Sequence, residues 1–126
     1  MNQAGKTLYH YNLPAHPQSL LSVIKPYLPD IAIAVECIFT WYWLADFCLE
    51  NNIPFVLGHA LYMKAIHGAK TKNDKIDSQK IAMLLRAGMI PMAYVYPAEM
   101  RSTRDLLRRR MHFVHKRSEL LAHISV

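Results

Sequence analysis

Cysteine is scarce in this chain, and so are the signals of export. Its two cysteines, Cys37 and Cys48, are too few for a disulfide framework, and no spacing of Cys and His indicates a zinc site. The first six residues contain no apolar segment of the kind that a secretory signal requires. These absences predict a reducing, cytoplasmic compartment.

Uncharged runs of membrane-spanning length are also missing. The longest apolar stretch covers residues 31–48 and contains Glu36 and Asp46, each of which would be costly in lipid. We therefore expect no membrane partner, and we interpret this stretch as a buried strand followed by a helix.

The sequence does contain enough apolar residues for a core, together with an unevenly placed positive charge. Of its 126 residues, 52% are apolar and 19% are charged, which is typical of a folded domain. The net charge is +6, yet residues 1–58 hold two basic and four acidic side chains, whereas residues 59–126 hold thirteen basic and five acidic ones. The second half of the chain therefore favours an anionic partner such as nucleic acid.

Periodicity predicts short strands and helices in alternation. Residues 7–11 alternate like a strand, and Pro17 can open a helix whose length Pro26 limits. The β-branched run of residues 31–35 has the pattern of a strand buried on both faces, with Glu36 at its carboxyl end.

A strand-helix-strand unit follows from the next segments. Thr40 can cap a helix through Leu49, in which we expect Trp41 and Trp43 to pack in the core. Residues 53–58 form another apolar run, so the order predicts a parallel pair of strands with a right-handed crossover.

Two further helices are predicted before a short extended link at residues 91–97. One is a helical turn at residues 61–66. The other runs from Asn73 or Asp74 to about Ala87. The core face of this second helix is predicted to carry three side chains: Ile76, Ile81, and Leu84 or Leu85.

The residues from 98 to the end have the pattern of one long helix. Met100, Leu107, Val114 and Leu121 repeat every seven residues, which is the period of a coiled-coil seam. Other seam positions are polar, so the seam is imperfect. We expect a helical hairpin or a dimer, not an isolated rod.

Three carboxylates are candidates for chemistry. Asp74 and Asp77 are three residues apart at a helix start, so both lie on one face, although such residues commonly cap a helix or complement its dipole. Glu36, directly after an apolar strand, is either at the carboxyl edge of a sheet, where α/β folds place their ligands, or a costly buried charge. Taken singly, the two aspartates favour a structural role at the helix start, whereas Glu36 fits a structural and a functional role equally well.

The combination is more informative. Glu36 facing Asp74 and Asp77 would form a cluster whose mutual repulsion divalent cations relieve, and hard oxygen ligands select Mg²⁺ or Mn²⁺. Two such ions can activate a nucleophile and stabilise a leaving oxygen in phosphodiester chemistry. Neighbouring basic side chains would hold the phosphate backbone: Lys70, Lys72 and Lys75.

Three segments closely resemble the DEDD-type insertion-sequence transposases, which are DNA recombinases guided by a bridge RNA. They are residues 35–43, residues 54–60 and residues 70–78, the last of which contains the pattern K-x-D-x-x-D. Residues 94–97 and the arginines that follow also look like this family's passage into its long coiled-coil helices. The similarity covers nearly the whole chain.

The resemblance implies an α/β fold: an incomplete RNase H-like (RuvC-like) domain lacking its first strands over residues 1–96, followed by the start of a coiled-coil helical region over residues 97–126. Glu36, Asp74 and Asp77 match the second, third and fourth acidic residues of the family's DEDD set, which implies catalytic and metal-binding roles with Mg²⁺ or Mn²⁺. The implied partners are DNA, a guide RNA and, through the coiled coil, a second copy of the chain.

The chain departs from the family pattern at both ends. The family's first acidic residue, an Asp, has no counterpart before Asp30. Its serine nucleophile, which belongs to a C-terminal domain, has no counterpart among Ser102, Ser118 and Ser125. We therefore expect a partial transposase that is inactive alone, and whose exposed strand edge promotes self-association.

Basic residues surround much of the final helix. Such a run is commonly a solvated helix face, but guanidinium groups also suit phosphate contacts, and the family context favours the backbone of DNA or RNA. The residues expected to make these contacts are Arg101, Arg104 and Arg108. Two alternatives stay open: a non-catalytic nucleic-acid-binding or dimerisation module, and a small metal-dependent nuclease that completes its site by dimerisation.

Overall fold

The structure, a computed structural model, describes residues 1–38, 41–67 and 74–125. The chain divides into two compact units, residues 1–94 and residues 95–126, and each is described by itself.

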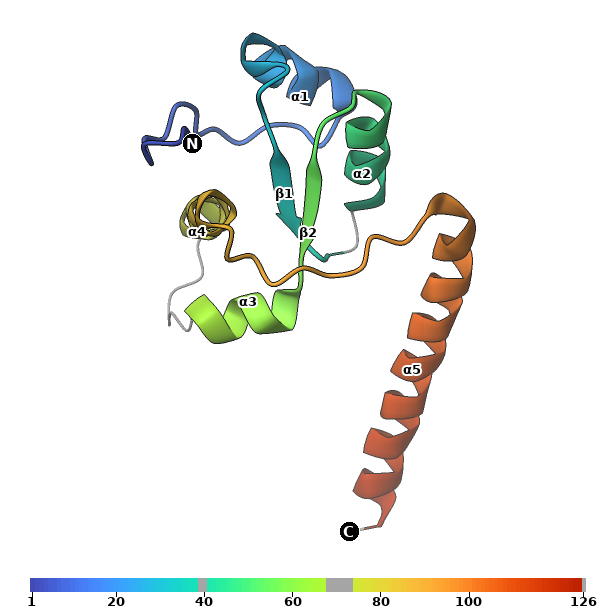
Figure 1. The fold of residues 1–126 in the computed structure, drawn as a ribbon. Helices are drawn as coiled ribbons and strands as arrows, with labels where there is room; N and C mark the ends of the chain where they lie inside the picture. The colour runs from blue at the N-terminus through green and yellow to red at the C-terminus, as the bar shows by residue number, and fades with distance from the viewer. Residues whose placement is uncertain (39–40, 68–73, 126) are drawn as a thin grey trace. The chain divides into compact units, whose positions relative to one another are not determined.

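The first unit has the predicted mixed α/β order (Figure 1). It begins with an irregular segment and then alternates helices with two short strands. The elements are α1 (Pro17–Ile24), a 3₁₀ turn (Lys25–Tyr27), β1 (Ile33–Glu36), α2 (Trp41–Glu50), β2 (Phe55–Gly58), α3 (Ala60–His67) and α4 (Asp74–Ala87).

Prolines and turn residues set several of these boundaries. Pro17 occupies the first turn of α1, where its missing N–H costs nothing, and Pro26 lies in the 3₁₀ turn that ends the helix. After α2, Asn52 adopts a left-handed φ of 54° and the N–H of Ile53 donates to the carbonyl of Cys48 at 2.8 Å. Gly88, with a φ of 67°, ends α4 in the same way.

β1 and β2 form a parallel pair, as the strand-helix-strand pattern predicted, with α2 as the crossover. The register places Ile33 opposite Phe55 and Glu36 opposite Gly58. On the outer side of β2, Gly58 forms an antiparallel bridge with Met92. The segment before residue 94 therefore runs along the edge of β2 and adds a short third row to the sheet.

The other edge of the sheet is open. The N–H groups of Ile33 and Cys37 donate to the carbonyls of Pro54 and Gly58, both at 2.9 Å, so they face β2. Strand alternation then turns the N–H groups of Ala34 and Glu36 toward the opposite edge. No strand within the described part of the chain pairs with β1 there.

The core lies between the sheet and helices α1 and α2. Ile24, Phe47, Cys48 and Ile53 form a buried cluster. Trp41 is fully buried, as predicted, and its ring stacks on Phe55 with centroids 6.4 Å apart. Trp43 is partly buried and packs against the same cluster.

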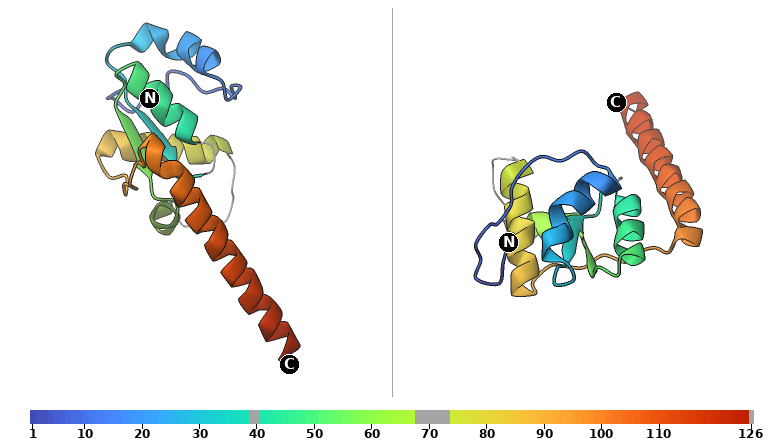
Figure 2. Two further views of the ribbon diagram at one scale, coloured as in Figure 1. Left: turned by 90° about the vertical axis from the view of Figure 1, so that its right-hand side faces the viewer. Right: turned by 90° about the horizontal axis from the view of Figure 1, so that it is seen from above.

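Helices α2 and α4 lie on opposite sides of the strand pair (Figures 1 and 2). Both strands are shorter than the predicted runs of residues 31–35 and 53–58. The prediction that the first strand is buried on both faces is wrong, because all four residues of β1 keep partial exposure. Helices α2 and α4 and the neighbouring strand β2 do not cover enough of the surface of β1 to bury it fully.

Three other sequence predictions concern residues 7–11, Ile76 and Thr40, and the two cysteines differ in burial. Residues 7–11 do not form a strand, because no neighbouring strand receives their backbone groups. Ile76 is 38% exposed, since α4 turns Leu84 and not Ile76 toward the interior. Cys37 is only half-buried, whereas Cys48 is fully buried. The predicted cap Thr40 lies outside the described residues.

The second unit is dominated by α5 (Ala98–Ile124), a helix of 27 residues with no buried side chain. Its start is fixed by contacts to Tyr96, whose carbonyl accepts a hydrogen bond from Arg101 Nε at 3.0 Å. The guanidinium of Arg104 lies 5.4 Å from the centroid of the Tyr96 ring. Over the part of the chain that the structure describes, no helix has the length and apolar character needed to cross a membrane.

Candidate functional site

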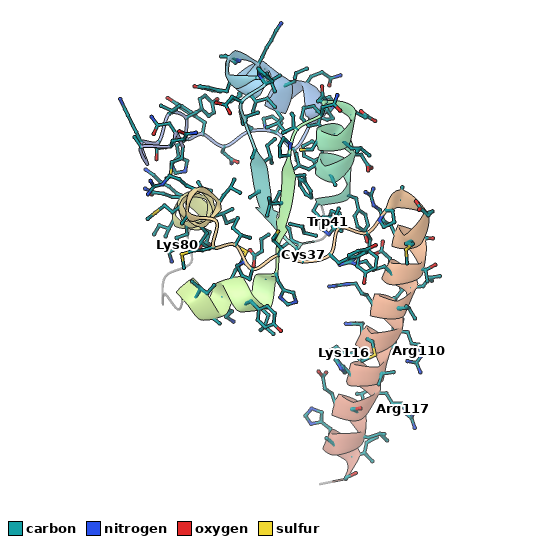
Figure 3. The ribbon with its side chains drawn as sticks, in the orientation of Figure 1. Cys37, Trp41, Lys80, Arg110, Lys116 and Arg117 are labelled. Atoms are coloured by element: carbon teal, nitrogen blue, oxygen red, sulfur yellow. The ribbon has the colours of Figure 1, made fainter. Side chains whose placement is uncertain are left out.

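Glu36 is the last residue of β1, and its position follows directly from the sheet topology. Because β1 and β2 are parallel, both end at the same edge, where Glu36 lies opposite Gly58. Cys37 and His59 follow the two strands at this edge, and Figure 3 shows Cys37 at this end of the strands. Open α/β sheets bind ligands outside the carboxyl ends of their strands. The half-buried Glu36 is therefore at the edge where a ligand is expected.

Helix α4 carries the two candidate aspartates at its start. Asp74 is its first residue, and Asp77 follows almost one turn later. Asp77 shares its helix face with Ile81 and Leu84, which lie four and seven residues further along, and Leu84 is buried. The exposed carboxylate of Asp77 thus lies at the solvent end of the face that packs inward.

The structure makes the two acid-bearing elements neighbours. Helix α4 packs against β1, and Figure 1 shows it beside that strand. Among the described side chains, which do not include that of Asp74, no three His, Cys, Asp or Glu residues converge closely enough to hold a metal ion. The described geometry therefore supplies two adjacent elements, of which β1 ends at Glu36 and α4 carries Asp77.

The chemistry of these donors suits a hard cation. Glu36 and Asp77 offer carboxylate oxygens, which Mg²⁺ and Mn²⁺ prefer, and the described part of the chain puts no arginine or lysine salt bridge on either residue. The charges of both carboxylates are therefore available to a ligand.

The basic residues predicted beside the aspartates are described only in part. Lys70 and Lys72 lie outside the described residues. Lys75 is exposed in the first turn of α4, two residues before Asp77. It is thus the one lysine of the predicted three that the structure places near the carboxylates.

Arg101 and Arg104, two of the predicted arginines, make contacts at the start of α5. Arg101 donates to the Tyr96 carbonyl, and Arg104 pairs with Asp105 at 3.2 Å while lying over the Tyr96 ring. The side chain of Arg104 is only 14% exposed. Both residues therefore stabilise the start of the helix, whatever else they contact.

Further along α5 the basic side chains extend into solvent. Arg108, like its neighbours Arg109 and Arg110, is exposed. Figure 3 shows Arg110 and Arg117 projecting from the same side of the helix, as their seven-residue spacing requires. This region presents guanidinium groups in the way that phosphate contacts need.

His59 was not singled out by the sequence, and the structure gives it an unusual position. Its ring stacks on Tyr62 at 4.4 Å between centroids, and its Nδ1 is buried with no hydrogen-bond partner in the described part of the chain. Its backbone is fixed by a 2.7 Å bond from its N–H to the Pro91 carbonyl. The sequence does offer a signal for His59. It directly follows an apolar run, as Glu36 does, and such a position indicates the edge of a sheet.

Comparisons with known proteins agree with the resemblance noted in the sequence. A family model described as a transposase, that of the DEDD-type IS110 group, matches residues 1–125. No curated protein and no solved structure matches the chain at a significant level. The family match covers nearly the entire chain, including both strands, the α4 aspartates and α5, so this protein belongs to the DEDD-type IS110 transposase family.

Proposed function

We propose that this chain is a partial DNA transposase: it carries metal-binding acids that serve strand cleavage and exchange in the intact family, and it is inactive alone. Glu36, Asp74 and Asp77 are the proposed catalytic and metal-binding residues. The observation that carries the proposal is that α4, which starts at Asp74, packs against β1, which ends at Glu36. Membership of the transposase family supports the same assignment.

In this proposal residues 1–96 are an incomplete RNase H-like (RuvC-like) domain, and residues 97–126 begin a coiled-coil region. The parallel strand pair with its crossover helix is compatible with that domain. The repeat of exposed apolar side chains along α5 supports pairing with a second copy of the chain.

The roles of the residues follow from their positions. Bound Mg²⁺ or Mn²⁺ would polarise a phosphodiester and lower the pKa of an attacking water or hydroxyl. Glu36 lies at the end of a strand that pairs with β2, and this pairing fixes the backbone from which its carboxylate extends. Asp74 and Asp77 add oxygen donors from a helix start, and Lys75 balances their charge and faces the phosphate backbone.

Nucleic acid is the proposed partner of the basic side chains. Arg108 and its neighbours on α5, with Lys70, Lys72 and Lys75, would contact the phosphates of DNA or of a guide RNA without reading bases. Arg101 and Arg104 take part by fixing the start of α5. The proposed catalytic set includes three acids and no serine nucleophile, so we propose that the polypeptide alone binds DNA without cleaving it.

A second candidate function is a non-catalytic module that binds nucleic acid or dimerises. The observation in its favour is α5, a helix of 27 residues, none of them fully buried, that combines basic and apolar side chains. This function needs no carboxylate cluster. It is distinguished from the first function because its DNA binding does not depend on Mg²⁺.

The experiment measures binding of a fluorescent DNA duplex to the whole chain by anisotropy, with and without Mg²⁺, and follows strand cleavage on gels. The matched variant is Glu36→Gln/Asp74→Asn/Asp77→Asn. We expect Mg²⁺ to tighten binding to the natural chain but not to the variant, and we expect no cleavage by either.

The outcomes separate the candidates. DNA binding that is unchanged by Mg²⁺ in both the natural chain and the triple variant would favour the non-catalytic module. Cleavage by the natural chain that the variant lacks would instead show a complete nuclease, and would contradict the proposed inactivity. A chain that binds no DNA under any condition would overturn both functions.

A further inference from the structure

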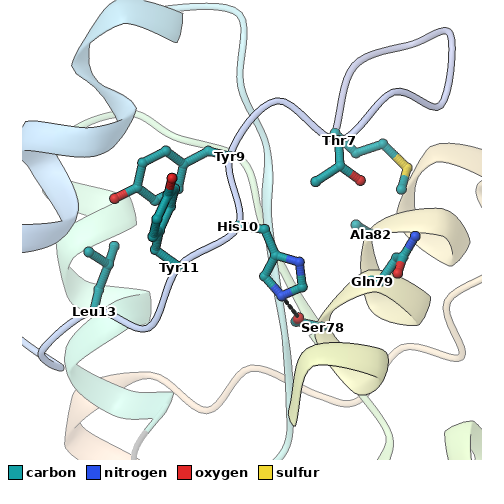
Figure 4. Close-up of a pocket in the computed structure, with 9 residues that line it drawn as sticks. Thr7, Tyr9, His10, Tyr11, Leu13, Ser78, Gln79 and Ala82 are labelled. Atoms are coloured by element: carbon teal, nitrogen blue, oxygen red, sulfur yellow. Dashed lines mark hydrogen bonds between the residues drawn. The ribbon is translucent and has the colours of Figure 1, made fainter. Parts of the chain in front are cut away.

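The irregular N-terminal segment lies against α4, and the two border a partly open cavity of about 200 Å³ (Figure 4). The segment supplies Thr7, Tyr9, His10 and Tyr11 to the wall, and α4 supplies Ser78 and Gln79. This volume is below the roughly 300–1,000 Å³ of sites that enclose drug-sized ligands, so the cavity fits a small flat group.

Two tyrosines form the aromatic part of the wall. The rings of Tyr9 and Tyr11 have centroids 4.7 Å apart and are tilted by 49°. They are 41% and 73% exposed, so neither ring is buried in the core. Exposed aromatic faces of this kind are the platforms on which nucleobases stack.

Polar groups complete the wall. His10 Nε2 and Ser78 Oγ lie 3.5 Å apart, and Figure 4 shows the two tyrosine rings on one side of His10 and Gln79 on the other. Within the described residues, Thr7 and Gln79 make no side-chain hydrogen bond to another protein group. Gln79 therefore offers both a donor and an acceptor, as the edge of a base requires.

The cavity is anchored beside the proposed catalytic helix. Ser78 and Gln79 directly follow Asp77 on α4. At the far end of the same helix, Arg86 donates to the carbonyl of Gln3 at 3.1 Å, which fixes the N-terminal turn. The segment is thus attached to α4 at two points, and the cavity lies beside the first of them.

We propose that this cavity is a subsite for one unpaired nucleobase of the nucleic acid on which the chain acts. The inference rests on the proposed function and deepens it. The phosphate contacts proposed for α5 and Lys75 do not involve the bases, whereas the cavity would bind one base directly. An unpaired base held next to Asp77 would fix the strand whose phosphates approach the carboxylates. A base within a duplex has both faces stacked and cannot enter.

The test compares single-stranded oligonucleotides with and without bases. Anisotropy titrations use labelled strands of equal length, one with normal bases and one with abasic residues, each in deoxy and ribo form. We expect the natural chain to bind the normal strand about five- to one-hundred-fold more tightly than the abasic one. The deoxy and ribo arms show which nucleic acid supplies the base.

Variants assign the preference to the cavity. Tyr9→Ala/Tyr11→Ala should bind normal and abasic strands alike, whereas Tyr9→Phe/Tyr11→Phe keeps the rings and should keep the preference. Tyr27→Ala, which removes an exposed tyrosine outside the cavity, is the matched control and should behave as the natural chain.

The result that overturns the subsite is equal affinity of the natural chain for normal and abasic strands. If that binding still weakens steeply with salt, the proposed nucleic-acid function stands and only the subsite fails. If no strand binds at all, both fail. Loss of the preference in Tyr27→Ala would also reject the cavity as its source.

Discussion

Glu36 at the end of β1 lies directly opposite Gly58 at the end of β2. Gly58 has no side chain, and the sulfur of Met63 occupies the space that a Cβ on Gly58 would need. Met63 is buried and lies in α3, so this packing joins the start of α3 to the edge that carries the carboxylate. The shape of the proposed site therefore depends on the absence of a side chain at Gly58.

Gly58→Ala is expected to destabilise the first unit by about 1–3 kcal/mol, because the added methyl group collides with Met63 in a packed interior. Urea denaturation followed by circular dichroism measures the change. Combining Gly58→Ala with Met63→Ala removes the collision, so the double variant should lose less than the sum of the two single losses. A Gly58→Ala variant as stable as the natural chain would contradict this packing.

Cys48 makes stability depend on pH at the alkaline end. Burial raises the pKa of its thiol from 9.0 to about 11. Between these values the unfolded chain loses the proton and the folded chain keeps it, so the free energy of unfolding falls as pH rises, by up to about 1.4 kcal/mol per pH unit. Below pH 9 the contribution of the protonated Cys48 thiol to the free energy of unfolding is fully present.

The measurement is urea denaturation between pH 8 and 11, comparing the natural chain with Cys48→Ala and with Cys37→Ala. We expect the Cys48→Ala curve to fall less steeply than the other two, since tyrosines and lysines contribute equally to all three. Identical slopes in the three proteins would show that Cys48 titrates alike in the folded and unfolded chain.

The exposed arginines of α5 are expected to determine the salt dependence of DNA binding. Arg109→Glu/Arg110→Glu should weaken binding and flatten the plot of log affinity against log salt, by about 0.9 for each phosphate that the variant no longer neutralises. Lys6→Glu/Lys25→Glu makes the same change in charge on exposed residues of the first unit and is the control. Equal effects of the two pairs would mean that only net charge matters.

The apolar side chains of α5 are expected to mediate self-association. Leu107 and Leu121 are 59% and 50% exposed, and they share the seven-residue seam. Leu107→Lys/Leu121→Lys should give a monomer in sedimentation equilibrium, because charge on a seam cannot be buried. Leu49→Lys, at a leucine that is 79% exposed on α2, should not change the oligomeric state. A natural chain that is monomeric at every concentration would reject the coiled coil.

The order of the elements could be predicted because each has a strong local signal. Pro17 begins α1, the β-branched run before Glu36 becomes β1, and an apolar run of strand length becomes β2. The parallel pairing then follows from the crossover through α2. Glu36 could be placed at the sheet edge from the same pattern.

Other features depend on what a segment packs against, which the local pattern does not encode. Residues 7–11 alternate like a strand, but a strand needs a backbone partner and they have none in the sheet. The face of α4 that turns inward is set by tertiary packing, so Ile76 is exposed although the spacing of apolar residues predicts a core position for it. The cavity beside Tyr9 likewise arises only when the N-terminal segment meets α4.

Titration with Mn²⁺, followed by the electron paramagnetic resonance signal of the free ion, tests the convergence of the carboxylates most directly. The natural chain should bind Mn²⁺, and Glu36→Gln and Asp77→Asn should each weaken that binding at least about tenfold, since each removes one oxygen ligand. Glu50→Gln, at an exposed carboxylate at the end of α2, should bind as the natural chain does. Equal Mn²⁺ affinity in the natural chain and Glu36→Gln would show that the acid at the end of β1 and the acids of α4 do not share an ion.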